Sequence, residues 1–160
     1  MPSFQKLFEE TDELTIQYKD KILHWADKFP VKDGDVLIAS IEKTNSEWIQ
    51  GLSIDITGSC EVNGKIWKQG KGVKMIFWED STVLDPKHIE IKIFTKKSFV
   101  VIQNIWESIN HLGNKSIDSG HNGAAMIIEE IENGRRYHCN DGHPDENFDD
   151  IVFTIQRLKQ

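Results

Sequence analysis

Residues 89–105, IEIKIFTKKSFVVIQNI, contain the pattern that decides the fold. Isoleucine recurs at every second position from Ile89 to Ile93, and the positions between carry Glu90, Lys92 and Phe94. Such alternation places one set of side chains on the core face of a β-strand and the other set outside. In Phe99–Ile102 both sets are apolar, which predicts a strand covered on both faces. Between the two runs, Thr95–Ser98 is predicted to form a hairpin turn.

The same alternation of period two continues through most of the chain after residue 35. The dipeptides Asn63-Gly64 and Asn133-Gly134 are typical of two-residue hairpin turns, because both central residues of such turns need positive φ. Short connections favour antiparallel meanders. We therefore predict a mainly β (α+β) fold, an antiparallel sandwich or curved sheet. Its seven or eight strands, some of them fused or short, are expected near residues 35–42, 48–58, 60–68, 72–79, 88–95, 98–106, 124–132, 135–139 and 151–158.

The N-terminal segment has a different pattern. Apolar residues recur at helical spacing, and Phe4, Leu7 and Phe8 could add a short helical turn ahead of them. Pro30 would end this helix, since the residue before proline is pushed out of helical geometry. We expect one domain over residues 1–160, with a helical segment of about 3–29 packed on a strand-rich body of about 35–158. The predicted apolar stripe consists of Tyr18, Ile22, Trp25, Ala26 and Phe29.

The overall charge limits the possible partners. The formal net charge is -7, whereas phosphate binding needs a concentrated basic patch, so nucleic acid is not an expected partner. No run of residues approaches the roughly 18 apolar residues of a membrane span. The sequence MPSFQKLFEETDEL has acids where a signal peptide needs a basic start, so we expect a cytoplasmic protein that does not bind membranes. In that compartment Cys60 and Cys139 would be thiols.

The most informative segment is acidic. Residues 141–150 contain five acids and no Lys or Arg. One interpretation is a solvated loop; another is a calcium site, although the segment lacks the EF-hand pattern. A third is that the carboxylates attract a basic protein partner, because a focused acidic patch speeds encounter with a basic protein. On this interpretation the partner-binding residues are Asp141, Asp145, Glu146, Asp149 and Asp150, widened by Glu79 and Asp80.

Two other groups of residues offer alternatives. His138, Cys139 and His143 lie close in sequence and could belong to a zinc site or to a hydrolase, with His111 and His121 as further candidates. Residues 138 and 139 would point to opposite faces of a strand, however, and no recognised catalytic motif is present. We therefore expect no enzyme activity, no cofactor and no metal. The role of the polar loop at residues 111–122 stays open.

Tryptophans supply the second alternative. A β-sandwich with exposed Trp can stack against a sugar or a small molecule, whereas large aromatics more often fill cores. A carbohydrate-binding or small-molecule-binding module is therefore a rival interpretation. The residues concerned are Trp48, Trp67, Trp78 and Trp106.

The segment GRRYHCNDGHPDENFDDIVFTI (residues 134–155), together with FWED (residues 77–80), resembles small bacterial immunity proteins of polymorphic or contact-dependent toxins. The resemblance implies a cytoplasmic inhibitor that binds a cognate toxin domain tightly and has no chemistry of its own. Many such toxin domains are basic nucleases, which suits an acidic inhibitor.

Overall fold

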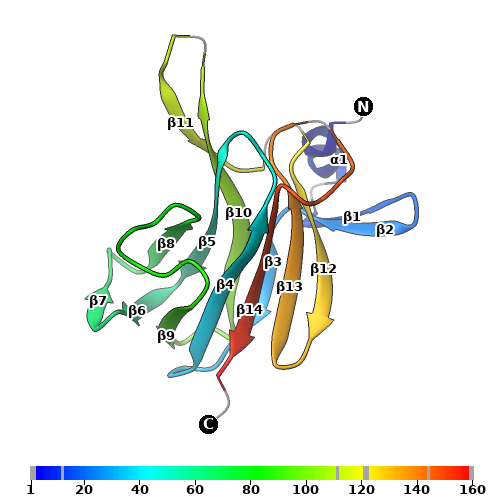
Figure 1. The fold of residues 1–160 in the computed structure, drawn as a ribbon. Coiled ribbons are helices and arrows are strands. Elements are labelled where there is room, and N and C mark those ends of the chain that lie inside the picture. The colour runs from blue at the N-terminus through cyan, green and yellow to red at the C-terminus, as the bar shows by residue number, and fades with distance from the viewer. Residues whose placement is uncertain (1–2, 12, 111, 121–122, 144, 159–160) are drawn as a thin grey trace.

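The computed structural model describes residues 3–11, 13–110, 112–120, 123–143 and 145–158. It is mainly β, with two antiparallel sheets and one N-terminal helix, as the sequence predicts (Figure 1). That helix, α1 (Phe4–Thr11), packs against the sandwich through Phe4 and Phe8. No helix among the described residues is long and apolar enough to cross a membrane.

The larger sheet has nine strands, and the smaller has four with one further strand attached. In spatial order the larger sheet contains β1 (Thr15–Tyr18), β2 (Lys21–His24), β12 (Ala125–Ile131), β13 (Gly134–Asn140), β14 (Ile151–Arg157), β4 (Val36–Thr44), β9 (Ile89–Thr95), β6 (Gly58–Val62) and β7 (Lys65–Trp67). The smaller sheet contains β11 (Lys115–Asp118), β10 (Phe99–Ile109), β5 (Ile49–Ile56) and β8 (Val73–Trp78), and β3 (Asp27–Pro30) pairs with β10.

The sheets do not form a simple meander. Residues 95–98 connect β9 of the larger sheet to β10 of the smaller one, so the predicted hairpin at this position is wrong. The chain changes sheet again between β5 and β6, where Gly58 adopts φ +146 and a Cβ would lie 2.1 Å from the carbonyl oxygen of Phe94. A short connection can turn back on its own sheet or cross to the facing one, and only packing decides between these outcomes.

The two Asn-Gly dipeptides do mark hairpins, but in different ways. Asn63 and Gly64 both have positive φ, at 54° and 77°, and join β6 to β7 as predicted. In the β12–β13 hairpin the turn residues are Glu132 and Asn133, and Gly134 already belongs to β13. Gly134 is required for a different reason, because a Cβ there would lie 2.0 Å from the carbonyl oxygen of Ile155.

The prediction of one helix ending before Pro30 is wrong. Among the described residues of this segment only α1 is helical, and residues 15–30 contain β1, β2 and β3 instead. Ile16 and Leu23 are buried against α1, whereas Ile22 and Trp25 of the predicted apolar stripe are exposed. Tertiary contacts override the helical spacing, since β3 pairs with β10 over four residues and β2 joins the edge of the larger sheet at Met126.

The core lies between the two sheets. Its fully buried side chains come from both, for example Leu37, Ile91 and Phe153 from the larger sheet and Ile54 and Ile102 from the smaller. The strand predicted to be covered on both faces at residues 99–102 is covered there on one face only, because Phe99 and Val101 are half-buried. Both faces are buried farther along β10, at residues 102–106, where it runs toward the acidic loop.

Candidate functional site

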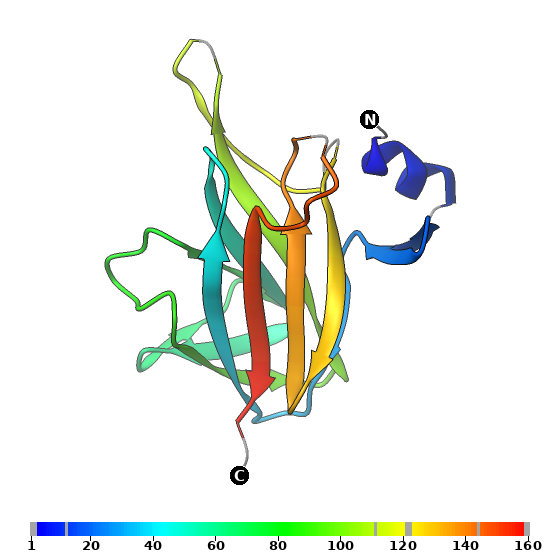
Figure 2. The ribbon, with the colours of Figure 1, turned by 45° about the vertical axis from the view of Figure 1, so that its right-hand side comes forward.

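Two acidic segments that are far apart in sequence meet at one end of the sandwich. The β4–β5 connection and the acidic loop lie at this end, with α1 beside them (Figure 2). Residues 79–80 reach the same end because Glu79, just after β8, accepts a hydrogen bond from the backbone N–H of Gln50 at 2.6 Å. We call residues 45–50, 79–80, 141–143 and 145–150 the loop end.

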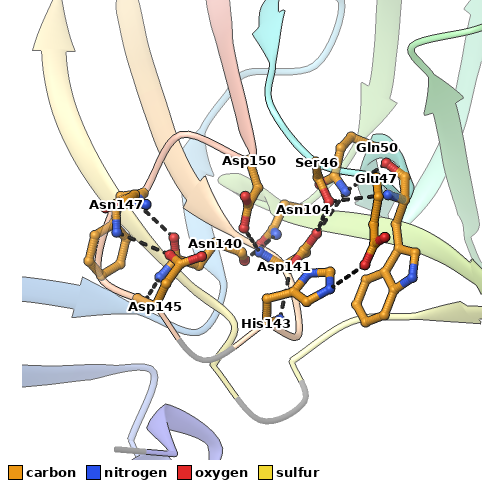
Figure 3. Close-up of polar contacts among 12 residues, drawn as sticks. Ser46, Glu47, Gln50, Asn104, Asn140, Asp141, His143, Asp145, Asn147 and Asp150 are labelled. Carbon is orange, nitrogen blue, oxygen red and sulfur yellow. Dashed lines mark hydrogen bonds and ion pairs between the residues drawn. The ribbon is translucent and has the colours of Figure 1, made fainter. Parts of the chain in front are cut away.

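Asp141 is the central carboxylate of the loop end and has no exposed surface. Its Oδ2 accepts hydrogen bonds from Oγ of Ser46 at 2.6 Å and from Nε2 of Gln50 at 3.0 Å. Its Oδ1 accepts the backbone N–H of His143 at 2.9 Å and lies 2.7 Å from Nδ1 of the same residue (Figure 3). A buried charge needs partners of this kind. Asp141 therefore ties the acidic loop to the β4–β5 connection.

Gln50 joins Asp141 to the second acidic segment. Its side chain reaches Asp141, while its backbone N–H donates to Glu79. The other carboxylate oxygen of Glu79 accepts a hydrogen bond from Oγ1 of Thr44 at 3.0 Å. Glu79 therefore links the end of β4 to the start of β5. Asp80 is exposed. Glu79 is thus occupied within the protein, and Asp80 is the residue of this segment that faces solvent.

The acidic loop is also braced from within. Asn140 donates through Nδ2 to the carbonyl oxygen of Asp145 at 2.7 Å and accepts the backbone N–H of Phe148 at 2.7 Å. Asp150 Oδ2 accepts the backbone N–H of Asp141 at 2.9 Å, across the base of the loop. Phe148, with φ +53, turns its ring into the protein, where it is buried and stacks on Phe4. These contacts brace the described residues of the loop, 141–143 and 145–150, against one another and against α1.

Asp150 is a buried carboxyl close to other carboxylates. Burial and the charges of Asp141 and Asp145 raise its pKa to about 7, although the hydrogen bond from the backbone of Asp141 opposes the shift. At neutral pH this group is therefore poised between its protonated and ionised forms.

His143 lies between two carboxylates and on an indole ring. Its Nε2 is 3.1 Å from Oε1 of Glu47, and its ring stacks on Trp48 with centroids 3.9 Å apart. Trp48 in turn stacks on Trp106, which is buried. Burial lowers the pKa of His143, but Asp141 and Glu47 outweigh that effect and leave the pKa above its ordinary value. Sequence reasoning missed Glu47 as a site residue, since its link to His143 depends on the approach of the β4–β5 connection.

The five acids of residues 141–150 do not share one role. Asp141 and Asp150 are buried, so in this structure a partner cannot reach them. Asp145 and Asp149 are half-buried at the surface, and Asp149 accepts Nδ2 of Asn45 at 2.9 Å. Glu146 pairs with Lys19 of the β1–β2 turn at 3.0 Å. The surface carboxylates of the loop end are Glu47, Asp80, Asp145, Glu146 and Asp149.

The histidine–cysteine group does not converge. The Nε2 atom of His138 lies 3.0 Å from Glu129, whereas Cys139 is fully buried, and burial together with the charge of Asp150 raises its pKa well above the ordinary value. Burial raises the pKa of Cys60 to about 11. Both thiols are therefore poor nucleophiles. Within the described ranges, no group of three or more His, Cys, Asp or Glu could hold a metal ion; His111 and His121 lie outside those ranges.

The tryptophans divide between core and surface. Trp106 is buried, and Trp48 and Trp78 are half-buried. Trp67 is 39% exposed, with Nζ of Lys65 only 4.3 Å from its ring centroid. Trp25 is 38% exposed, although its sequence pattern predicts a buried helical position.

Comparisons of this chain with protein-family models, with curated proteins and with solved structures give no match. The assignment of a function therefore rests on the geometry and charge of the loop end.

Proposed function

We propose that this chain is an acidic binding protein of the immunity type, which acts in the cytoplasm and neutralises a basic cognate toxin domain by covering its active site with the loop end. One observation carries the proposal. The buried pair Asp141 and Asp150 fixes the acidic loop from within, while Asp145 and Asp149 remain at the surface. Surface carboxylates held on a fixed loop lose little conformational entropy when a partner binds.

In this proposal only some of the carboxylates of the loop end contact the partner, and the others hold the loop in place. Asp141, Asp150 and Glu79 hold the shape, and the partner pairs with the surface carboxylates Glu47, Asp80, Asp145, Glu146 and Asp149. Their charge steers a basic partner toward the loop end, and the pairs that become desolvated at the centre of the contact contribute most to affinity.

The test begins with capture of proteins from the native cell by the tagged chain, at low and at moderate salt. We expect a protein with a basic domain, identified by mass spectrometry, whose expression alone stops growth and whose co-expression with this chain restores it. Asp80→Lys combined with Asp145→Lys should weaken binding at least tenfold and abolish the growth rescue, since two attractive contacts become repulsive.

Glu90→Lys combined with Glu132→Lys is the matched control. Both residues are exposed and lie on β9 and in the β12–β13 turn, outside the loop end, and the change in net charge is the same. This control should rescue growth like the unmodified chain. Equal binding by the two double variants, or capture of no growth-inhibiting partner, would contradict the proposal.

A further inference from the structure

A cavity of about 350 Å³ lies beside α1, the helix whose Phe4 stacks on Phe148 of the acidic loop. One wall comes from α1, with Phe8 and Glu9, and another comes from Glu13 and Leu14 in the following segment. The rest of the lining consists of Gln5, Trp25, Ser119 and Gly120. Its volume lies at the lower end of the range of small-ligand pockets.

Trp25 is held in this cavity through three hydrogen bonds. Its backbone N–H donates to the carbonyl oxygen of Leu14 at 2.7 Å, and its carbonyl oxygen accepts Nε2 of Gln103 at 3.0 Å. Its indole Nε1 donates to the carbonyl oxygen of Gly120 at 3.4 Å. Gly120 lies so close that an added Cβ would come within 2.2 Å of Nε1. Two of these bonds hold the backbone of Trp25, whereas the third and the close approach of Gly120 position the indole, which is 38% exposed.

The cavity combines this aromatic ring with negative charge. Glu9 and Glu13 are both exposed and both line it. An indole face attracts a cation through its quadrupole, and a planar guanidinium can stack on the ring while its N–H groups reach a carboxylate. A neutral sugar could use the ring but would gain no ion pair from the two glutamates.

We infer that the cavity at Trp25 is a binding pocket for an arginine side chain presented by the basic partner. That the arginine belongs to the basic partner rests on the proposed function. The pocket adjoins the loop end through α1, because Phe4 of the helix stacks on Phe148 of the acidic loop with ring centroids 5.9 Å apart. The arginine would thus enter beside the carboxylate surface, as an anchor within the same interface.

The pocket can be tested without the partner. The probe is N-acetyl-arginine amide, titrated into the ¹⁵N-labelled chain while the indole N–H signals are followed by NMR; Trp25→Phe assigns the Trp25 signal. We expect a saturable shift of that signal with a dissociation constant in the millimolar range. N-acetyl-citrulline amide, which has nearly the same shape without the charge, should bind at least threefold more weakly.

Two controls lie within the chain. Trp67 is as exposed as Trp25, but Lys65 already lies over its ring, so its signal should not respond. Glu13→Gln should weaken arginine amide binding roughly threefold to tenfold. The proposal that this pocket binds arginine would be overturned by a Trp25 signal that does not move, by equal binding of citrulline amide, or by an unchanged affinity in Glu13→Gln. None of these results depends on the capture experiment, so the two proposals can fail separately.

Discussion

The Nδ1 atom of His143 lies 2.7 Å from Oδ1 of Asp141, a carboxylate with no exposed surface. The two residues are separated in sequence by Gly142, which packs against both Trp106 and Trp48: a Cβ there would lie 3.1 Å from the first ring and 3.4 Å from the second. The acidic loop is therefore joined to the β-sandwich by charge and by aromatic packing at the same point, and its shape should depend on both.

Replacing Asp141 by Asn should destabilise the fold. The amide keeps the size of the carboxylate, but its NH₂ group cannot accept the donors that Asp141 now satisfies. We expect a loss of about 2–4 kcal/mol in the free energy of unfolding, measured with urea at pH 7. Asp145→Asn, at the surface of the same loop, should cost less than about 1 kcal/mol. Equal stabilities of the two variants would contradict the central role of Asp141.

Asp150 should make stability depend on pH. Its pKa in the folded state is raised to about 7 from an ordinary value of 3.8, so the folded state holds the proton more tightly than the unfolded state. The contribution of this group to stability is therefore full below about pH 4 and is lost as the pH rises toward 7 and above.

The Asp150→Asn side chain cannot ionise, but its amide oxygen can still accept the hydrogen bond from the backbone N–H of Asp141. At pH 8 we expect this variant to be about 1–2 kcal/mol more stable than the unmodified chain, allowing for partial solvent screening. The difference should shrink toward pH 4. Parallel stability curves for the two proteins between pH 4 and pH 8 would rule out this role for Asp150.

His143 should make stability depend on pH in the same direction as Asp150, but from a different cause, because nearby carboxylates favour its charged form. Its pKa is raised in the folded state, so the stability that it contributes is fully present below its unfolded value of 6.5 and is lost as the pH rises through the folded value. An NMR titration of the His143 ring should give a midpoint above 6.5. Glu47→Gln should lower that midpoint, because it removes one of the two carboxylates; an unchanged midpoint would show that the contact with Glu47 does not persist in solution.

Phe148 should couple the acidic loop to α1. Its ring is buried and stacks on Phe4, so Phe148→Ala should cost about 3–4 kcal/mol. Each substitution should leave a cavity at the same ring contact. The double variant Phe4→Ala/Phe148→Ala should therefore lose clearly less unfolding free energy than the two single variants lose in total. Urea denaturation measures these values, and amide hydrogen exchange should show faster exchange in α1. Additive losses would mean that the two rings act independently.

The sequence by itself determined the class of the fold and most of the strand positions. Alternation such as that of Ile89–Ile93 predicts a strand even when the neighbouring strands are unknown. The reason is that burying one face of a strand needs an apolar residue at every second position. Asn63-Gly64 likewise predicted its hairpin, since positive φ at both turn residues is a local property. The clustering of acids at 141–150 was visible in the same way.

Only the tertiary structure decided which strands pair and which acids are accessible. Residues 15–30 have helical spacing but form strands, since β3 gains a partner in β10 that no local pattern reveals. Asp141 and Asp145 are the same residue type four positions apart, yet one is buried and the other is at the surface. Ser46 and Gln50, about 90 positions earlier in the chain, make the difference: their hydrogen bonds compensate the desolvation of one carboxylate, and such long-range compensation exists only once the chain has folded.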